Sequence, residues 1–378
     1  MGKSKKAAAN EEFDTFLQDL QKATKETGKQ KAKDAKKKHP TKADVVAKNN
    51  AKTSEEKTTR VNEFEAVLKR QQQQRLIQQM LSQIQMGGMG GFGSPFLNAP
   101  KTDIESFTKT AAGFVVGSAG MQGWRKEMED AEVVDMDLED DGKTGLFAVF
   151  DGHAGSKCST GTAKVFPMLA RQHYKKDSGV DFTKMYSDLD NSLKAKLSDD
   201  SGCTAVSVFI NDKTIVCANV GDSRAVLCRD GKCISLSEDH KPENAEEKAR
   251  IIAAGGHVAD NRTNGQLAMS RAIGDFSYKK NADLPADKQL VISVPEIMTE
   301  TRDAAKDEFL VVACDGIFDV MTNEEVVEFT HAGFQDNKTP EEIARALTEK
   351  CLAPVDEQGR PARPLGTDNM TATVIKLI

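Results

Sequence analysis

The sequence has no apolar run long enough to cross a membrane and no paired-cysteine motif. Its apolar runs fall short of the roughly 18–20 residues that a transmembrane helix needs. The N-terminal segment MGKSKKAAANEEFD lacks the apolar core of a signal peptide, so we do not expect secretion. The seven cysteines form no CxxC pair and no spacing typical of a metal site. We therefore expect a reducing compartment, cytoplasmic or nuclear.

Charge is distributed unevenly along the chain. The net charge is −6, yet the first 100 residues carry more Lys and Arg than Asp and Glu, and the remainder carries an excess of acid. An acidic body suits a cation site and argues against broad nucleic-acid binding. The sequence therefore predicts no specific nucleic-acid partner.

The N-terminal third has the composition of an appendage. Residues 1–60 predict a basic, mostly disordered arm with one short amphipathic helix. Residues 61–86 predict a Gln-rich amphipathic helix, which could pack on the body or bind a partner. Residues 87–110 predict a Gly-rich linker. We expect a monomer, with residues 111–378 as the folded domain.

The basic arm also permits attachment to a membrane surface. Gly2 stands beside a Lys cluster, as in chains that combine acylation with polybasic attachment. The simple acylation pattern requires Ser or Thr at position 6, where this chain has Lys6. Membrane attachment is therefore not favoured over partner docking or a solubilising tail.

From about residue 110 the chain alternates short β-rich runs with helical stretches. The β-rich runs are 113–119, 145–152, 204–210, 214–220, 223–236, 290–297, 308–316 and 371–378. The helical stretches are 156–174, 182–197, 242–256, 323–333 and 340–351. Asp230-Gly231 is a tight-turn dipeptide within 223–236 and predicts a hairpin there. Strands follow one another through short links, which predicts an α+β fold with layered, mainly antiparallel sheets.

Acidic residues recur where the apolar runs end. FAVFDGHAG places Asp151 directly after a strand, and Asp222 and Asp315 also follow apolar runs. Asp368 stands just before the last apolar run. One Asp-Gly pair is ordinary turn chemistry. Four carboxylates at four strand ends instead indicate a polynuclear site for Mg²⁺ or Mn²⁺, which prefer oxygen ligands.

Further residues near these acids suggest phosphoryl chemistry. Arg125 belongs to a residue type that binds phosphate bidentately, and Glu129 and Asp130 follow it closely. An exposed ion-paired segment is the alternative for these three. His153 follows Asp151 by two positions and is a candidate general acid, although a lone histidine is more often structural.

Taken together, the motifs resemble those of a known family. GWRKEMEDA, VFDGHAG, SGCTAV, VGDSRAVL, DHKP, NGQLAMSRAIGDF, ACDGIFDVM and DNMTATVI occur across roughly residues 112–378. In this order they are similar to the motif set of the metal-dependent protein phosphatases of type 2C. The resemblance implies a central antiparallel β-sandwich flanked by helices, dependence on Mg²⁺ or Mn²⁺, and hydrolysis of phosphoserine and phosphothreonine.

The resemblance also implies roles for individual residues. Two ions would be bridged by Asp151, with further ligands from the Gly152 carbonyl, Glu129, Asp315 and Asp368, and a weaker third ion would involve Asp222 and Asp319. Asp130 would orient a ligand or a bound water. Arg125 would hold the substrate phosphate, His153 would protonate the leaving oxygen, and Arg271 would lie near the site.

These implications predict a single-step hydrolysis of phosphoproteins by a metal-bridged hydroxide. Two alternatives stay open. One is a phosphatase of a small-molecule phosphomonoester. The other is a phosphoprotein-binding protein without activity, against which the presence of every core ligand position argues.

Overall fold

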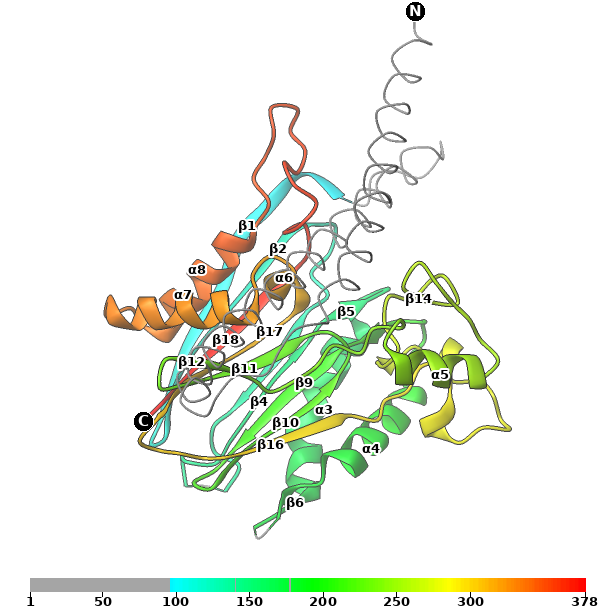
Figure 1. The fold of residues 1–378 in the computed structure, drawn as a ribbon, viewed down its shortest axis with the longest axis horizontal. Helices are drawn as coiled ribbons and strands as arrows, with labels where there is room; N and C mark the ends of the chain where they lie inside the picture. The colour runs from blue at the N-terminus through cyan, green and yellow to red at the C-terminus, as the bar shows by residue number, and fades with distance from the viewer. Residues whose placement is uncertain (1–95, 140, 177) are drawn as a thin grey trace, which may run out of the picture. The chain divides into compact units, whose positions relative to one another are not determined.

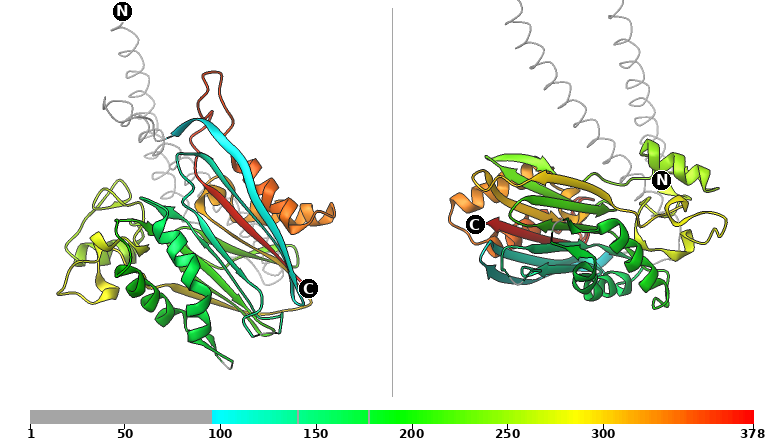
Figure 2. Two further views of the ribbon diagram at one scale, coloured as in Figure 1. Left: turned by 180° about the vertical axis from the view of Figure 1, so that it is seen from behind. Right: turned by 90° about the horizontal axis from the view of Figure 1, so that it is seen from below.

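The computed structural model describes residues 96–378, except residues 140 and 177. The predictions for the arm 1–60, for the helix 61–86 and for residues 87–95 lie outside the described residues. Within the described part, two antiparallel sheets lie face to face, with helices on the outer side of each (Figures 1 and 2). No helix of this part combines the length and apolarity that a membrane crossing requires.

The larger sheet has six strands and the smaller has five. The order in the six-stranded sheet is β1 (Phe96–Ala111), β2 (Phe114–Arg125), β18 (Met370–Leu377), β17 (Asp307–Ala313), β11 (Arg224–Arg229), β12 (Lys232–Ser235). The order in the five-stranded sheet is β16 (Glu296–Thr301), β10 (Thr214–Val220), β9 (Ala205–Ile210), β4 (Gly145–Phe150), β3 (Ala131–Asp135). A short three-stranded ladder joins β15 (Ile273–Gly274), β8 (Gly202–Cys203) and β5 (Gly152–His153). Two-stranded ladders join β6 (Tyr174–Lys175) to β7 (Gly179–Val180) and β13 (Val258–Ala259) to β14 (Arg262–Thr263).

Side-chain alternation along the strands builds the layers. In β4, Phe147 and Val149 point into the core between the sheets, whereas Leu146, Ala148 and Phe150 point to the helix-covered side. All six residues of β4 are buried, because both faces of its sheet are covered. A continuous apolar run therefore predicts a central strand here more reliably than strict alternation does.

Helices cover both outer faces. α3 (Lys157–His173) and α4 (Phe182–Lys194) pack on the five-stranded sheet, and α7 (Asn323–Gln335) and α8 (Pro340–Cys351) pack on the six-stranded one (Figure 1). Capping boxes begin α7 at Thr322 and α8 at Thr339. In each, the threonine side chain accepts a hydrogen bond from the backbone amide of the glutamate three residues later, and the side chain of that glutamate accepts one from the backbone amide of the threonine. α5 (Ala245–Ala253) and the 3₁₀ turns η1 (Phe276–Tyr278) and η2 (Ala286–Lys288) lie in the excursion between β12 and β16.

The predicted α+β class with antiparallel sheets is confirmed. The hairpin at Asp230-Gly231 is present between β11 and β12, and both turn residues have positive φ angles, as a type I′ turn requires.

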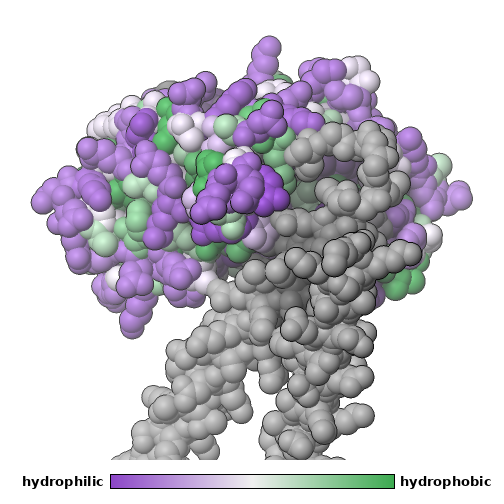
Figure 3. All heavy atoms as spheres, turned by 90° about the horizontal axis from the view of Figure 1, so that it is seen from above, coloured by the Kyte–Doolittle hydropathy of each residue, from purple (hydrophilic) through white to green (hydrophobic). Residues whose placement is uncertain are grey.

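In the face shown in Figure 3, hydrophilic residues dominate and hydrophobic ones gather in small groups between them. One predicted strand differs: Leu290–Pro295 is irregular apart from a bridge at Ile292, and β16 begins at Glu296.

The predicted linker was wrong over residues 96–110, because these residues form β1. β1 is an edge strand paired with β2, and most of its side chains are exposed or half-buried. Ser106 and Thr108 donate hydrogen bonds to the Glu341 carboxylate of α8, at 2.8 and 2.6 Å. A polar edge strand has no continuous apolar run, and its stability depends on these distant partners.

Close packing of α8 on β2 requires glycine at position 117. A Cβ atom on Gly117 would lie 1.9 Å from the Glu341 backbone nitrogen. We expect Gly117→Ala to lower the free energy of unfolding by about 1–3 kcal/mol or more, because α8 would have to move away. Urea denaturation in the absence of added metal measures this. Gly120→Ala is the matched control in β2, where the nearest atom is a flexible methionine terminus at 3.3 Å. Equal losses in both variants would contradict the packing argument.

Candidate metal centre

Four aspartates lie where strands begin or end at one end of the sandwich. Asp151 directly follows β4, and Asp315 follows β17 as the second residue past the strand and the first of α6 (Asp315–Phe318). Asp222 lies between β10 and β11, and Asp368 lies two residues before β18. Because β17 and β18 are antiparallel neighbours, the end of one lies beside the start of the other. The topology thus brings together residues far apart in the sequence.

A glycine allows the two C-terminal acids to approach. A Cβ atom on Gly316 would lie 1.9 Å from the Asn369 carbonyl oxygen. Only a residue without a side chain permits α6 to sit this close to the start of β18. The close approach sets Asp315 beside Asp368, which is the leading negative charge acting on Asp315.

The carboxylates lie in one another's electrostatic field. Burial raises the pKa of Asp151 well above its usual value, and the charges of Asp315, Asp130, Asp368 and Asp222 raise it further. Burial likewise raises the pKa of Asp315, with contributions from the carboxylates at 368, 319 and 222. Such mutual elevation is the signature of like charges sharing a site. Asp151, Asp315, Asp368 and Asp222 thus lie near enough to influence one another, and their role as metal ligands stays a prediction.

The donor set fits hard divalent cations. Among the described residues, Asp130 Oδ1 and Asp315 Oδ1 are buried without a hydrogen-bond partner. Lys241, to which the sequence analysis gave no role, pairs with Asp222, and Arg125 pairs with Asp368. These two cations leave other buried carboxylates of the cluster uncompensated. Unpaired carboxylate oxygens in a buried acidic cluster are the ligands that Mg²⁺ and Mn²⁺ prefer.

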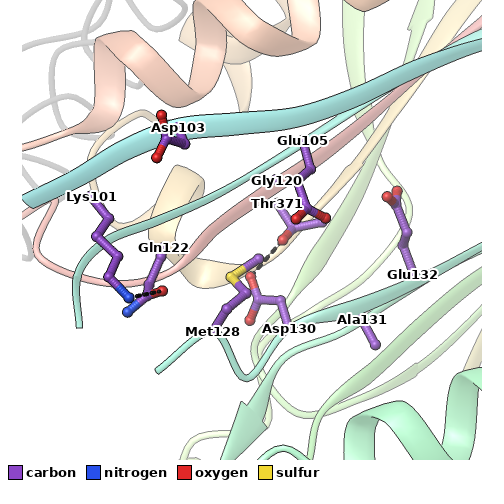
Figure 4. Close-up of a pocket in the computed structure, with 10 residues that line it drawn as sticks. All are labelled: Lys101, Asp103, Glu105, Gly120, Gln122, Met128, Asp130, Ala131, Glu132 and Thr371. Atoms are coloured by element: carbon purple, nitrogen blue, oxygen red, sulfur yellow. Dashed lines mark hydrogen bonds between the residues drawn. The ribbon is translucent and has the colours of Figure 1, made fainter. Parts of the chain in front are cut away.

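Asp130 lies at the edge of the cluster, beside a cavity of about 440 Å³ between β1, β2 and β3 (Figure 4). Its Oδ2 accepts a hydrogen bond from Thr371 Oγ1 at 2.7 Å. Burial above all, and the charge of Asp368, raise the pKa of Asp130 to about 7. Cys314 Sγ also lies within 4.8 Å of ligand atoms of Asp130 and Asp151. Burial raises the pKa of this thiol, so it stays protonated and is a poor ligand for a hard ion.

The structure places Glu129 at the margin of the cluster. Its Oε1 accepts a hydrogen bond from the Gly155 amide at 2.7 Å, in the turn after His153. Its own amide donates to Asn369 Oδ1 at 2.9 Å. One carboxylate oxygen of Glu129 is thus engaged by the Gly155 amide. The other oxygen is the one that would bind an ion in the predicted ligand role.

His153 has a partner that the sequence analysis missed. Its Nε2 lies 2.7 Å from Asp275 Oδ2, and Asp275 is almost fully buried. Burial lowers the pKa of His153, but the hydrogen bond and charge of Asp275 outweigh it, and the net shift is upward. Asp275 lies in the SRAIGDF part of a sequence motif, in an irregular segment where its backbone is left-handed (φ 48°). No pattern in that segment predicts its contact with His153, which lies 122 positions earlier.

Arg125 projects into the acidic site from the end of β2. Its Nη2 lies 2.5 Å from Asp368 Oδ2, and its side chain is 45% exposed. Burial lowers its pKa, but Asp368, Asp315 and Asp151 raise it more, so the guanidinium stays charged. A partly exposed cation at the mouth of an acidic cluster is suited to attract a phosphate dianion.

Arg271 lies in a different cluster. Two of its nitrogens donate to Glu247 Oε1, at 3.0 and 2.6 Å, and a third donates to the Val294 carbonyl. Arg250 Nη1 also pairs with Glu247, at 2.6 Å. The structure thus ties Arg271 to α5, and its expected place beside the carboxylates is not supported by any of these contacts.

The same cluster holds a buried histidine. Burial, and then the charge of Arg271, lower the pKa of His240 to about 4. His240 therefore stays neutral in the fold while an unfolded chain takes up a proton near pH 6.5. Its contribution to stability is present above pH 6.5 and is lost as pH falls towards 4.

We expect His240→Gln to lose less unfolding free energy than wild type as the pH falls. The variant keeps an acceptor for the Gly221 amide, which donates to His240 Nδ1 at 3.1 Å, but it does not titrate. Between pH 7.5 and 4, wild type should lose up to roughly 3 kcal/mol more than the variant. Urea denaturation across this range measures the difference. Parallel curves for the two proteins would show that His240 does not titrate as argued.

Comparison with known proteins agrees with this architecture. Residues 114–358 match the family model described as protein phosphatase 2C. A probable protein phosphatase 2C of Caenorhabditis elegans is 42% identical over 288 residues, covering 75% of this chain and 80% of that protein. Protein phosphatase 2C homolog 2 of Schizosaccharomyces pombe is 38% identical, covering 75% and 78%. A crystal structure of a Toxoplasma gondii phosphatase has a TM-score of 0.61 at 25% identity, covering 73% of this chain and 96% of that one.

The solved Toxoplasma gondii phosphatase matches the fold that carries the acidic cluster in this chain. The chain belongs to the protein phosphatase 2C family. It is therefore an enzyme, a metal-dependent protein serine/threonine phosphatase, and the resemblance seen in the sequence is confirmed. The family generally depends on Mg²⁺ or Mn²⁺, which agrees with the donor set described above.

Proposed function

We propose that this protein hydrolyses phosphoserine and phosphothreonine in proteins with two divalent ions at the carboxylate cluster. The observation that supports it most directly is the set of buried, mutually repelling carboxylates around Asp151. Phosphorylated proteins are the proposed substrates. A monomer remains our expectation for its assembly.

The residues that would hold the ions are those at the strand ends. Asp151 would contribute to both ions, with the Gly152 carbonyl as a further ligand. Glu129 would contribute to one ion, and Asp315 and Asp368 to the other, with Asp222 and Asp319 beside a weaker third. Bound Mg²⁺ or Mn²⁺ would lower the pKa of water and offset charge on the phosphate oxygens. Asp130, with one oxygen held by Thr371, would orient ligands through the other.

Arg125 would bind the phosphate. In the structure its guanidinium pairs with Asp368. If that carboxylate coordinates a cation instead, the fork of N–H donors on Arg125 becomes available for two phosphate oxygens. Its exposure lets a protein-borne phosphate reach it from solvent.

His153 would protonate the departing serine or threonine oxygen. Asp275 accepts from the Nε2 side of the ring and stabilises the imidazolium. The proton for the leaving group would then come from Nδ1, which is buried and has no hydrogen-bond partner among the described residues. Arg271 acts at most indirectly in this scheme, through Glu247 and α5.

The test is Mn²⁺-dependent turnover by the full-length chain of phosphopeptides and of small phosphomonoesters. We expect phosphoserine and phosphothreonine peptides to be cleaved with a higher kcat/KM, and chelation of metal to abolish turnover. Preferential cleavage of a sugar or nucleotide monophosphate would favour the small-molecule alternative. Binding of phosphopeptides without release of phosphate, with metal present, would favour an inactive phosphoprotein-binding protein.

A further inference from the structure

A second group of metal-ligating side chains lies on the six-stranded sheet, away from the carboxylate cluster. Cys228 of β11, Glu308 of β17 and His331 of α7 each offer a ligand atom, and these atoms lie within 4.8 Å of one another. The cysteine is buried and the other two are half-buried. Since Cys228 follows Arg224 by four residues of extended chain, it lies roughly 13 Å further from the catalytic end.

A β-bulge aims Glu308 into this group. Arg229 pairs with Asp307 and Cys228 pairs with Phe309, so Glu308 is the extra residue of β17. A bulge re-aims the side chain of its extra residue. Here Glu308 Oε1 receives a hydrogen bond from the Gly231 amide at 2.7 Å and lies 3.7 Å from Cys228 Sγ.

The histidine is oriented by α7, which packs over β11 and β12 (Figure 1). His331 Nδ1 lies 3.1 Å from Glu308 Oε2, and His331 Nε2 lies 2.9 Å from the side-chain amide of Gln335, one turn later. The atom of Gln335 that faces the ring is its amide nitrogen, which donates to Nε2, so the proton of the neutral ring is on Nδ1. This Nδ1 is buried and has no hydrogen-bond partner among the described residues. An ion bound at Nδ1 would move the proton to Nε2, and the Gln335 amide would turn its oxygen towards it.

A second cysteine lies beside the group. Cys233 of β12 is the cross-strand partner of Cys228, one pair away from the two-residue turn. In a hairpin of this type that pair is not hydrogen-bonded, and its side chains lie close on one face. Cys233 is not among the residues whose ligand atoms lie within 4.8 Å of one another, so its side chain would have to turn to complete a set of four ligands.

We propose that Cys228, Glu308 and His331, with Cys233 as the fourth ligand, form a binding site for a thiophilic divalent cation such as Zn²⁺. Tetrahedral Zn²⁺ takes Cys, His and carboxylate ligands at about 2.0–2.3 Å, which puts ligand atoms roughly 3.3–3.8 Å apart. Cys228 Sγ lies 3.7 Å from Glu308 Oε1, and His331 Nδ1 lies 3.1 Å from Oε2, the other oxygen of the same carboxylate. Both separations are close to this range. Thiolate and imidazole ligands together discriminate this site from the catalytic cluster, where carboxylates predominate.

The competing explanation is an ion pair between Glu308 and His331 with a thiol beside it. Burial, and then the charge of Glu308, raise the pKa of Cys228 to about 12, so the thiol is protonated at neutral pH and donates to Glu308. An ion must therefore displace this proton, as at other cysteine sites. The two explanations differ in whether a sulfur–metal bond forms when a thiophilic ion is supplied.

Co²⁺ distinguishes them spectroscopically. Full-length protein is freed of metal, kept reduced so that Cys228 and Cys233 cannot pair, and titrated with Co²⁺ in excess Mg²⁺, which occupies the oxygen-ligand cluster. We expect a saturable thiolate-to-Co²⁺ charge-transfer band at one equivalent, with the visible spectrum of a tetrahedral ion, and displacement by Zn²⁺. Zn²⁺ should also raise Tm in the presence of Mg²⁺.

Variants assign the band to this site. Glu308→Gln and His331→Gln, which alter half-buried positions, should weaken Co²⁺ binding at least tenfold, and Cys228→Ser should remove most of the band. Cys233→Ser should reduce its intensity. Cys351→Ala, a buried cysteine of α8, is the matched control and should retain the band and the affinity. Absence of the band in wild type, or its full retention in Cys228→Ser and Glu308→Gln, would overturn the proposal. Phosphopeptide turnover with Mn²⁺ is measured in parallel and should be unchanged in Glu308→Gln.

Discussion

Asp151→Asn should abolish phosphatase activity and, at the same time, stabilise the metal-free protein. The side chain keeps its shape but loses the charge that four other carboxylates oppose. Removing a buried like charge relieves the repulsion, so Tm in chelator should rise. Losing the shared ligand should lower kcat/KM on phosphopeptides by about a thousandfold or more, a loss typical of a principal electrostatic group.

The measurement pairs activity with thermal unfolding with and without Mn²⁺. Wild type should gain Tm on adding Mn²⁺ because the ions bind only the folded state, and the variant should lose most of that gain. Asp287→Asn removes an exposed carboxylate from η2 and is the control for net charge. A variant that keeps both the Mn²⁺-dependent gain and wild-type turnover would refute the proposed role of Asp151.

His153→Gln should show a loss of activity that depends on the leaving group. A serine or threonine alkoxide needs a proton as it departs, so turnover of phosphopeptides should fall by about 10²–10⁴-fold. An aryl phosphate such as p-nitrophenyl phosphate has a stable leaving anion, and its turnover should fall far less. The ratio of the two losses identifies proton donation more specifically than either loss alone.

Asp275→Asn tests whether the partner of His153 acts through it. Because Asp275 stabilises the protonated ring, the variant should lower the upper pKa in the kcat profile on phosphopeptides. Asp275→Asn should also slow turnover of phosphopeptides more than turnover of the aryl phosphate, by a smaller ratio than His153→Gln does. If His153→Gln slowed both substrates equally, the residue would serve binding or structure and not proton transfer.

The core strands and the acids that follow them were predictable from sequence. A strand that is covered on both faces is a continuous apolar run, as in β4, β9 and β17. An Asp that directly follows such a run, as Asp151 follows β4, lies at the end of the sheet where the strand ends. The turn dipeptide Asp230-Gly231 marked the β11–β12 hairpin through purely local chemistry. These features depend on near neighbours in the chain, which is why sequence reasoning reached them.

Features that depend on distant partners were not predictable. β1 is held by β2 and Glu341, and its own residues resemble a polar linker. Asp275, Lys241 and the group around Cys228 involve side chains that the fold joins from separate strands, loops and helices. Arg271 and Glu129 were placed near the site by resemblance, but the direction in which each side chain points is set by partners on α5 and in the turn at Gly155.

The direction of β1 has a consequence for whatever precedes it. Phe96, the first residue of β1, pairs with Arg125, so the chain enters the folded body on the side where substrate phosphate is proposed to bind. The described part of the chain therefore begins beside Arg125, and not at the opposite end of the sandwich. A binding motif joined to the chain at this point would raise the effective concentration of a bound phosphoprotein near Arg125 without changing the catalytic residues.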